Sequence, residues 1–263
     1  QEILGVTEAN ITGADNFITL SKKGQITVWT QGEKNTLKEE LSFTLPAGKR
    51  VLTVSAAPVK DKKAQIFVSY FDKKRQTIST AVLENQNGTL KEITSLSYFA
   101  KELGCGQNKQ IWLQKPFVSG AYPGNARLIA YTDGKFAPAK ETLSTYRNWL
   151  TGLNRYAVES ADAQNVIYTS SNGPLRLVMA SGKRAESKDL FAAAPNRVKY
   201  KQEILKFYPS VQVFGPEGRA TLAAVENISK LGILSDTFGQ YKSSKIHFLP
   251  VRYRYGRIGR RGI

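Results

Sequence analysis

Apolar and polar residues alternate along this chain in short runs that are separated by polar turns. The clearest example lies within Ala64–Leu83, where two such runs flank the turn Phe71–Gln76. In the first run Ile66, Val68 and Tyr70 form one face, which is more apolar than the face between them. A period of two is typical of a β-strand, because successive side chains of a strand point to opposite faces. The segment therefore predicts two strands joined by a tight turn.

The same strand–turn–strand pattern recurs along the chain. In each copy, two runs rich in β-branched or aromatic residues are joined by Gly, Asn, Asp or Lys, as hairpin turns require. The first core positions of the copies are spaced about 50 residues apart on average, and further turns leave room for a third and a fourth strand. Four strands in roughly 40 to 50 residues is the size of one β-propeller blade. The further copies are Asn16–Thr30, Ala126–Ala139, Asn165–Met179 and Ala220–Leu249.

We therefore predict an all-β fold, namely a β-propeller built from about five four-stranded, blade-like repeats. Each repeat alone is a small sheet with two faces to cover, and stacking against neighbours around an axis covers both. Because the repeat pattern ends at residue 249, either the ring closes with five blades or it is incomplete. The repeats occupy residues 1–249, with approximate blades 1–48, 49–100, 101–150, 151–200 and 201–249.

Helical signals are scarce. The two candidate segments are Ser97–Leu103 and Ser187–Ala194, each for one or two turns of helix. Neither keeps an apolar stripe long enough for a helix of average length. Alternating β/α units, and the parallel sheet that they build, are therefore disfavoured.

The chain is strongly basic. It contains 38 Lys and Arg residues against 21 Asp and Glu residues, which gives a net charge of +17 and a pI of 9.9. Such an excess favours anionic partners, which include nucleic acid, acidic polysaccharide, lipid head groups and acidic proteins. A generally basic surface without a dedicated site is the alternative.

Two observations bear on the compartment. No apolar run approaches the roughly 18 residues that a membrane-spanning helix needs, so no transmembrane segment is predicted. The first residue is Gln1 and no basic-then-apolar signal pattern follows it, so we interpret the chain as a processed, mature form. That interpretation is compatible with export, although a trimmed chain would begin in the same way.

Residues that carry catalysis are few. Cys105 is the single cysteine, so no internal disulfide is available. His247 is the single histidine and alternates with Ile246 and Phe248 in a strand pattern, so no Ser–His–Asp set is predicted. We expect Cys105 to be a structural thiol and His247 to be a packing or edge residue of a strand. No phosphate-binding glycine loop or nucleophile elbow is predicted. We therefore predict no catalytic residue, while carboxylates of different repeats could still pair near a propeller axis, as in a glycosidase.

The last segment, 250–263, is a basic tail rich in Arg, Tyr and Gly. Guanidinium forks pair with phosphates and tyrosine rings stack on bases, so this tail is a candidate polyanion-binding site. A basic strand edge that discourages sheet-to-sheet pairing and an unstructured end are the alternatives. The candidate residues are Arg252, Tyr253, Arg254, Tyr255, Arg257, Arg260 and Arg261.

Part of the chain resembles a known repeat. Val54–Ala57, Pro58–Lys63 and Ala64–Val68 are similar to the small-residue strand, the loop and the Ile/Val strand of the integrin-type FG-GAP/VCBS repeat. From about Lys49 to Leu249 the chain resembles the VCBS-repeat propellers of exported bacterial proteins. The resemblance implies a β-propeller but no particular activity. Further matching elements are Leu83–Leu90, Lys115–Phe117 and Tyr241–Ile246.

The loops depart from the family pattern. The family loop resembles D-x-D-G-D-G, and its carboxylates hold calcium. Here each corresponding loop keeps one carboxylate, and the first loop also contains three lysines. A single carboxylate beside lysines cannot supply the roughly six to eight oxygen ligands that calcium takes, so we infer that calcium has been lost and predict no cofactor. The loops are Pro58–Lys63 with Asp61, Ser160–Gln164 with Asp162, and Phe214–Gly218 with Glu217.

These observations predict a non-catalytic, exported bacterial β-propeller that acts as a binding or structural scaffold. Its partner would be a protein or a cell-surface polymer met on one propeller face, where loops cluster. Its location would be the periplasm, the outer surface or the extracellular space. The alternatives are a protein that binds a polyanion, either nucleic acid or acidic glycan, and a propeller glycosidase with carboxylates near the axis.

Overall fold

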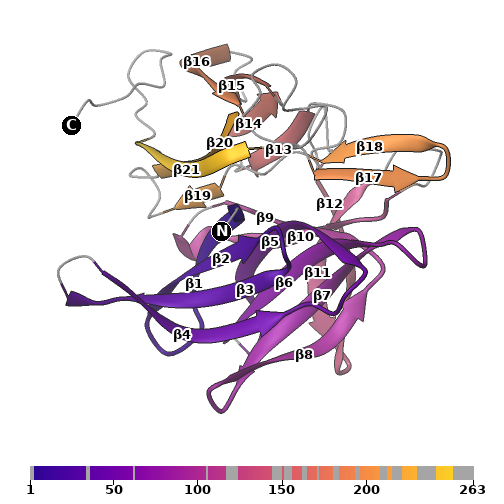
Figure 1. The fold of residues 1–263 in the computed structure, drawn as a ribbon. Coiled ribbons are helices and arrows are strands. Elements are labelled where there is room, and N and C mark those ends of the chain that lie inside the picture. Colours follow the sequence, from indigo (N-terminus) through magenta and orange to yellow (C-terminus); the bar gives the residue numbers. More distant parts are fainter. Residues whose placement is uncertain are drawn as a thin grey trace. The chain divides into compact units, whose positions relative to one another are not determined.

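The chain divides into two units in the computed structural model (Figure 1). The N-terminal unit comprises Ile3–Glu102 and Gln110–Ser144, and the C-terminal unit comprises Gln1–Glu2, Leu103–Lys109 and Thr145–Ile263. Each unit is described by itself. The structure describes residues 3–33, 36–61, 63–104, 106–116, 124–143, 150, 156–161, 165–170, 172–179, 184–192, 196–207, 212–214, 221–229 and 241–250.

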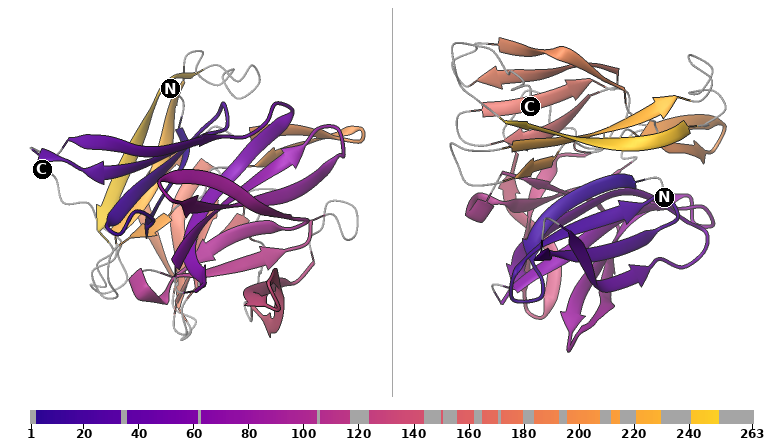
Figure 2. Two further views of the ribbon diagram at one scale, coloured as in Figure 1. Left: turned by 90° about the horizontal axis from the view of Figure 1, so that it is seen from below. Right: turned by 60° about the vertical axis from the view of Figure 1, so that its left-hand side comes forward.

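Three four-stranded antiparallel sheets make up the N-terminal unit, and Figure 2 shows them from two further directions. Within each sheet, neighbouring strands are also neighbours in sequence. This order is that of a propeller blade, in which the chain runs up and down from one strand to the next. The first sheet contains β1 (Ile3–Asn10), β2 (Asp15–Ser21), β3 (Gln25–Gln31) and β4 (Leu37–Thr44). The second contains β5 (Lys49–Lys60), β6 (Lys63–Asp72), β7 (Thr77–Gln86) and β8 (Thr89–Leu96). The third contains β9 (Phe99–Leu103), β10 (Gln110–Gln114), β11 (Ala126–Thr132) and β12 (Lys135–Thr142).

The C-terminal unit contains one further four-stranded sheet in chain order, a two-stranded sheet and a three-stranded sheet. A short 3₁₀ helix, η2 (Gly106–Asn108), belongs to the same unit. The four-stranded sheet consists of β13 (Tyr156–Ala161), β14 (Asn165–Ser170), β15 (Asn172–Met179) and β16 (Arg184–Ala192). The others consist of β17 (Asn196–Tyr200) with β18 (Glu203–Phe207), and of β19 (Gln212–Phe214), β20 (Thr221–Ser229) and β21 (Tyr241–Pro250).

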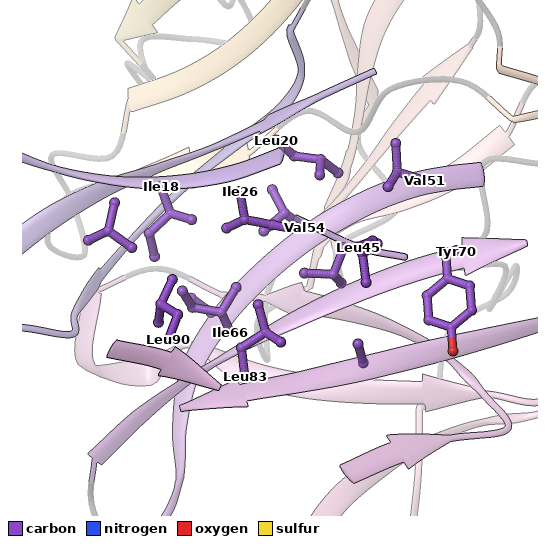
Figure 3. Packing of buried hydrophobic residues seen from close by; sticks show 14 of the residues in the cluster. Ile18, Leu20, Ile26, Leu45, Val51, Val54, Ile66, Tyr70, Leu83 and Leu90 are labelled. Carbon is purple, nitrogen blue, oxygen red and sulfur yellow. The ribbon is translucent and has the colours of Figure 1, made fainter. Parts of the chain in front are cut away.

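One face of the second sheet packs on the first sheet. Val54, Val68 and Ala81 lie side by side across β5, β6 and β7. They belong to a buried cluster that also contains Ile18 and Ile26 of the first sheet. Figure 3 shows side chains of both sheets meeting in this cluster. Removing these aliphatic side chains from water stabilises the pairing of the two sheets.

The opposite face of the second sheet packs on the third sheet. Phe67 and Val82 pair across β6 and β7, are fully buried, and share a cluster with Ile111 and Leu113 of β10. The Phe67 ring meets the ring of Phe136 edge-on, with centroids 6.2 Å apart. The second sheet is therefore buried on both faces, as a blade between two neighbours is. In a two-layer sandwich each sheet would bury one face.

The predicted fold class is confirmed: the described residues form an all-β structure, in which four of the six described sheets are four-stranded, antiparallel and blade-like. Closure into a ring stays a prediction. The two segments considered as helices form strands instead, since Ser97–Leu103 contains β9 and Ser187–Ala194 overlaps β16.

One repeat is offset by a strand. The copies Asn16–Thr30 and Ala64–Leu83 correspond to the second and third strands of their sheets, whereas Ala126–Ala139 forms the third and fourth, β11 and β12. The reason is the connection between β10 and β11. It runs from residue 115 to 125 and is too long for a tight hairpin turn. The strand–turn–strand pattern in the sequence therefore matches the next hairpin, β11–β12.

Candidate functional site

Two lysine-rich turns lie at the same end of the N-terminal unit. The β2–β3 turn and the β6–β7 turn each follow the second strand of a sheet, so the up-and-down order puts them at equivalent ends. Both are hydrogen-bonded to the connection between β4 and β5. The Leu45 N–H donates to the Gly24 carbonyl oxygen at 3.0 Å, and the Lys73 N–H donates to the Gly48 carbonyl oxygen at 3.3 Å. Since the anchor points Leu45 and Gly48 are three residues apart, the two turns lie within roughly 20 Å of each other.

The β2–β3 turn has the sequence Ser-Lys-Lys-Gly from Ser21 to Gly24. Gly24 takes a φ of +85°, and its N–H donates to the Ser21 carbonyl oxygen at 3.0 Å. A glycine adopts this left-handed conformation without the strain that a side chain brings. The tight turn leaves Lys22 and Lys23 exposed at its tip.

The β6–β7 turn is built around an aspartate. Asp72 Oδ1 accepts hydrogen bonds from the backbone N–H groups of Lys74 and Arg75, each at 2.9 Å. An aspartate that binds the backbone two and three residues ahead fixes such a turn. The side chains of Lys73, Lys74 and Arg75 are exposed as a result. We call Lys22, Lys23, Lys73, Lys74 and Arg75 the basic turn surface.

Small residues lie between the two turns. Pro46, Ala47 and Gly48 are exposed, and a Cβ atom added to Gly48 would meet no other atom within 4 Å. Two further cations, Lys49 and Arg50, follow Gly48 in the sequence. The Lys49 ammonium lies 3.7 Å from a Glu92 oxygen. Burial lowers the pKa of the half-buried Arg50 guanidinium, which stays charged at neutral pH. The three residues between the turns are therefore exposed and flanked by positive charge.

The turns at the opposite end of these sheets carry mixed charge. Asp61 and Asp133 lie in the β5–β6 and β11–β12 turns with φ near +53°. The Lys60 ammonium lies 3.3 Å from a Glu84 oxygen, and this hydrogen bond raises the pKa of Lys60. The two turns of the basic turn surface thus hold five cations and one carboxylate, Asp72, whereas the described turns at the opposite end carry both signs.

A buried carboxylate connects the first strands of the three sheets. Glu102 of β9 is 2% exposed, and its oxygens accept hydrogen bonds from the Thr7 hydroxyl of β1 at 2.7 and 2.8 Å. One of these oxygens also accepts from the Ala56 N–H of β5 at 2.6 Å. The Glu102 N–H donates to Ser55 Oγ at 3.0 Å. These bonds make Glu102 a structural anchor, so it lends no support to the alternative of a glycosidase.

A second buried polar network connects the second sheet to β9. Ser69 and Thr80 lie opposite each other on β6 and β7, with their hydroxyl oxygens 2.8 Å apart. Ser69 Oγ accepts from the Ala100 N–H at 2.9 Å, and the Thr80 hydroxyl donates to the Tyr98 carbonyl oxygen at 2.7 Å. The less apolar face of β6, which contains Ser69, is therefore buried because this hydroxyl group finds partners.

The predicted calcium loops are described only in part. Asp61 lies in the β5–β6 turn beside Lys60 and Lys63, while Asp162 and Glu217 lie outside the described residues. Over the described ranges, no three His, Cys, Asp or Glu side chains are grouped so that they could hold a metal ion. The loss of calcium stays a prediction.

We expect added calcium, or its removal with EDTA, to shift the midpoint of thermal unfolding by less than about 1 °C, because a ligand stabilises only a native state that binds it. Thermal denaturation followed by circular dichroism at several calcium concentrations measures this. A midpoint that rises steadily with calcium concentration would contradict the inferred loss.

Of the remaining residues singled out in the sequence, the structure describes His247 but not Cys105 or the tail. His247 lies on β21 opposite Ala224 of β20 and is half-buried, as expected for a strand residue. Cys105 and the tail candidates Arg252, Tyr253, Arg254, Tyr255, Arg257, Arg260 and Arg261 lie outside the described residues. Among the residues that the structure does describe, no helix has the length and apolar character to cross a bilayer.

Comparisons with known proteins add little. No protein-family model matches the chain, and no curated protein matches it. A crystal structure of a protein from Lactobacillus plantarum aligns with 88% of this chain and 67% of that chain, at 13% identity and a TM-score of 0.37. This similarity is too low to assign a function.

Proposed function

We propose that this chain is a non-catalytic binding protein of the exported bacterial FG-GAP/VCBS propeller type, and that it binds a cell-surface polymer. The observation that carries the proposal is the second sheet, which is buried on both faces and presents the exposed residues Lys73, Lys74 and Arg75 on a turn at one end. A rigid stack of sheets with exposed turns at its ends is a common way to present binding residues. The resemblance of Val54–Val68 to the FG-GAP/VCBS repeat supports the same class.

The chemistry of the described residues fits binding better than turnover. Glu102 is engaged by Thr7 and Ala56 within the core. The exposed cations of the basic turn surface are four lysines and one arginine, which attract anions without transferring protons at neutral pH. The polyanion alternative is therefore also a binding function, restricted to anionic polymers. The glycosidase alternative requires a separate site with paired carboxylates.

The proposal predicts binding without product. We expect the full chain to co-sediment with at least one purified insoluble cell-surface polymer from a panel of peptidoglycan, acidic and neutral polysaccharides. We also expect that no new reducing ends or soluble fragments form during prolonged incubation. Heat-denatured protein serves as the control for non-specific sedimentation. Release of fragments by the native chain would replace the proposal with a polymer-degrading enzyme, and absence of binding to every polymer would reject it.

A further inference from the structure

The basic turn surface consists of residues that the sequence did not mark as a binding site. The sequence pointed to the tail at Arg252–Arg261, whereas the structure gathers five exposed cations on two turns of the N-terminal unit. Asp72, the carboxylate of the second turn, is held by the backbone N–H groups of Lys74 and Arg75. The surface around the turns therefore carries a clear excess of positive charge.

We propose that the basic turn surface binds an acidic polysaccharide, with Lys23, Lys73 and Lys74 as principal contacts. This inference rests on the proposed function, because it names the polymer class and the site. The two turns flank the connection Leu45–Gly48, in which Pro46, Ala47 and Gly48 are exposed. A small anion reaches one turn at a time, whereas a polymer contacts both, and the second contact benefits from the high effective concentration that the first creates.

The chemistry favours a polysaccharide over a nucleic acid. Proteins that bind single-stranded nucleic acid combine positive charge with aromatic rings on which bases stack. The aromatic residues next to the second turn, Tyr70 and Phe71, are buried in the core and cannot supply such a platform. Four of the five cations of the surface are lysines, which act as point charges and lack the paired geometry of the arginine fork that favours nucleic-acid recognition. Export, as proposed above, would bring the surface into contact with such polymers.

Charge-matched variants of the full chain test the site. The turn variant carries Lys23→Gln, Lys73→Gln and Lys74→Gln. The control variant carries Lys63→Gln, Lys91→Gln and Lys135→Gln, which lie near the opposite end of the sheets. The tail variant carries Arg252→Gln, Arg254→Gln and Arg257→Gln. All three lose the same net charge, and unfolding midpoints equal to that of the parent chain show that the turn and control variants fold.

Fluorescence anisotropy with labelled heparin oligosaccharide measures binding across a series of salt concentrations, with duplex DNA and neutral dextran as comparison probes. We expect the turn variant to bind heparin about tenfold or more weakly at low salt, with the slope of log K against log salt reduced by about two to three. The control and tail variants should change affinity less than about threefold. Duplex DNA should bind more weakly than heparin, and dextran should not bind.

Each other outcome rejects a defined part of the account. Equal losses in all three variants would show that only total charge matters and would overturn the site. A loss confined to the tail variant would move the site to residues 252–261. Duplex DNA bound as tightly as heparin, with the same sensitivity to the turn variant, would overturn the ligand class. If heparin does not bind while another polymer of the sedimentation panel does, the inference fails and the proposed function stands; if no polymer binds, both fail.

Discussion

Replacing Glu102 by alanine is expected to lower the free energy of unfolding by about 3–5 kcal/mol. The carboxylate is buried and accepts from the Thr7 hydroxyl and the Ala56 N–H, which belong to the first strands of two other sheets. Alanine leaves both donors buried without this acceptor and adds a cavity. Urea denaturation followed by tryptophan fluorescence measures the loss.

Two further variants test whether the loss of stability comes from the hydrogen bonds of Glu102 and not from the removal of any carboxylate. Glu102→Gln keeps the length of the side chain and one carbonyl oxygen, so we expect a smaller loss of about 1–3 kcal/mol. Glu39→Ala removes an exposed carboxylate on β4 and should change the stability by less than about 0.5 kcal/mol. If Glu102→Ala lowered the free energy of unfolding as little as Glu39→Ala, the structural role assigned to Glu102 would be wrong.

Phe67→Ala and Ile66→Ala, at adjacent positions on β6, are both expected to be strongly destabilising. Ile66 faces the first sheet and Phe67 faces the third, and both are fully buried. Truncation should cost about 3–5 kcal/mol for the phenylalanine and about 2–5 kcal/mol for the isoleucine, because each leaves a cavity in a packed core. The same urea denaturation measures both.

Phe43→Ala on the outer strand β4 provides the matched truncation. Phe43 is only partly buried against the first cluster, so its replacement should cost less than half as much as that of Phe67. If only one face of the second sheet were buried, one of the two β6 variants would leave the free energy of unfolding nearly unchanged. That pattern would reject the blade-like packing.

The strands could be predicted from sequence where the turns are short. Phe71–Gln76 contains the β6–β7 turn, and Ser21–Gly24 forms the β2–β3 turn, because an aspartate or glycine at the right position sets each turn locally. The segment Phe-Ala-Lys-Glu-Leu of β9 gave no such signal. Its residues favour helices in isolation, and its burial, including that of Lys101 and Glu102, depends on partners distant in sequence.

Sequence alone reveals the two turns of the basic turn surface but not that they lie together. Both lysine-rich turns are visible in sequence, but each has the composition of an ordinary hairpin turn. What brings them together is their equivalent place after the second strand of a sheet, together with their bonds to Leu45 and Gly48. The repeat alignment contained this information, since Asn16–Thr30 and Ala64–Leu83 align turn on turn.

The most direct test of the central claim is an NMR measurement of distances between methyl groups in the N-terminal unit. The account predicts nuclear Overhauser effects on both faces of the second sheet. Ile66 and Leu83 should show them to methyl groups of Ile18 or Ile26 in the first sheet, and Val82 should show them to those of Ile111 or Leu113 in the third. Inter-sheet effects on one face alone would contradict the account, because the second sheet would then not lie between two others.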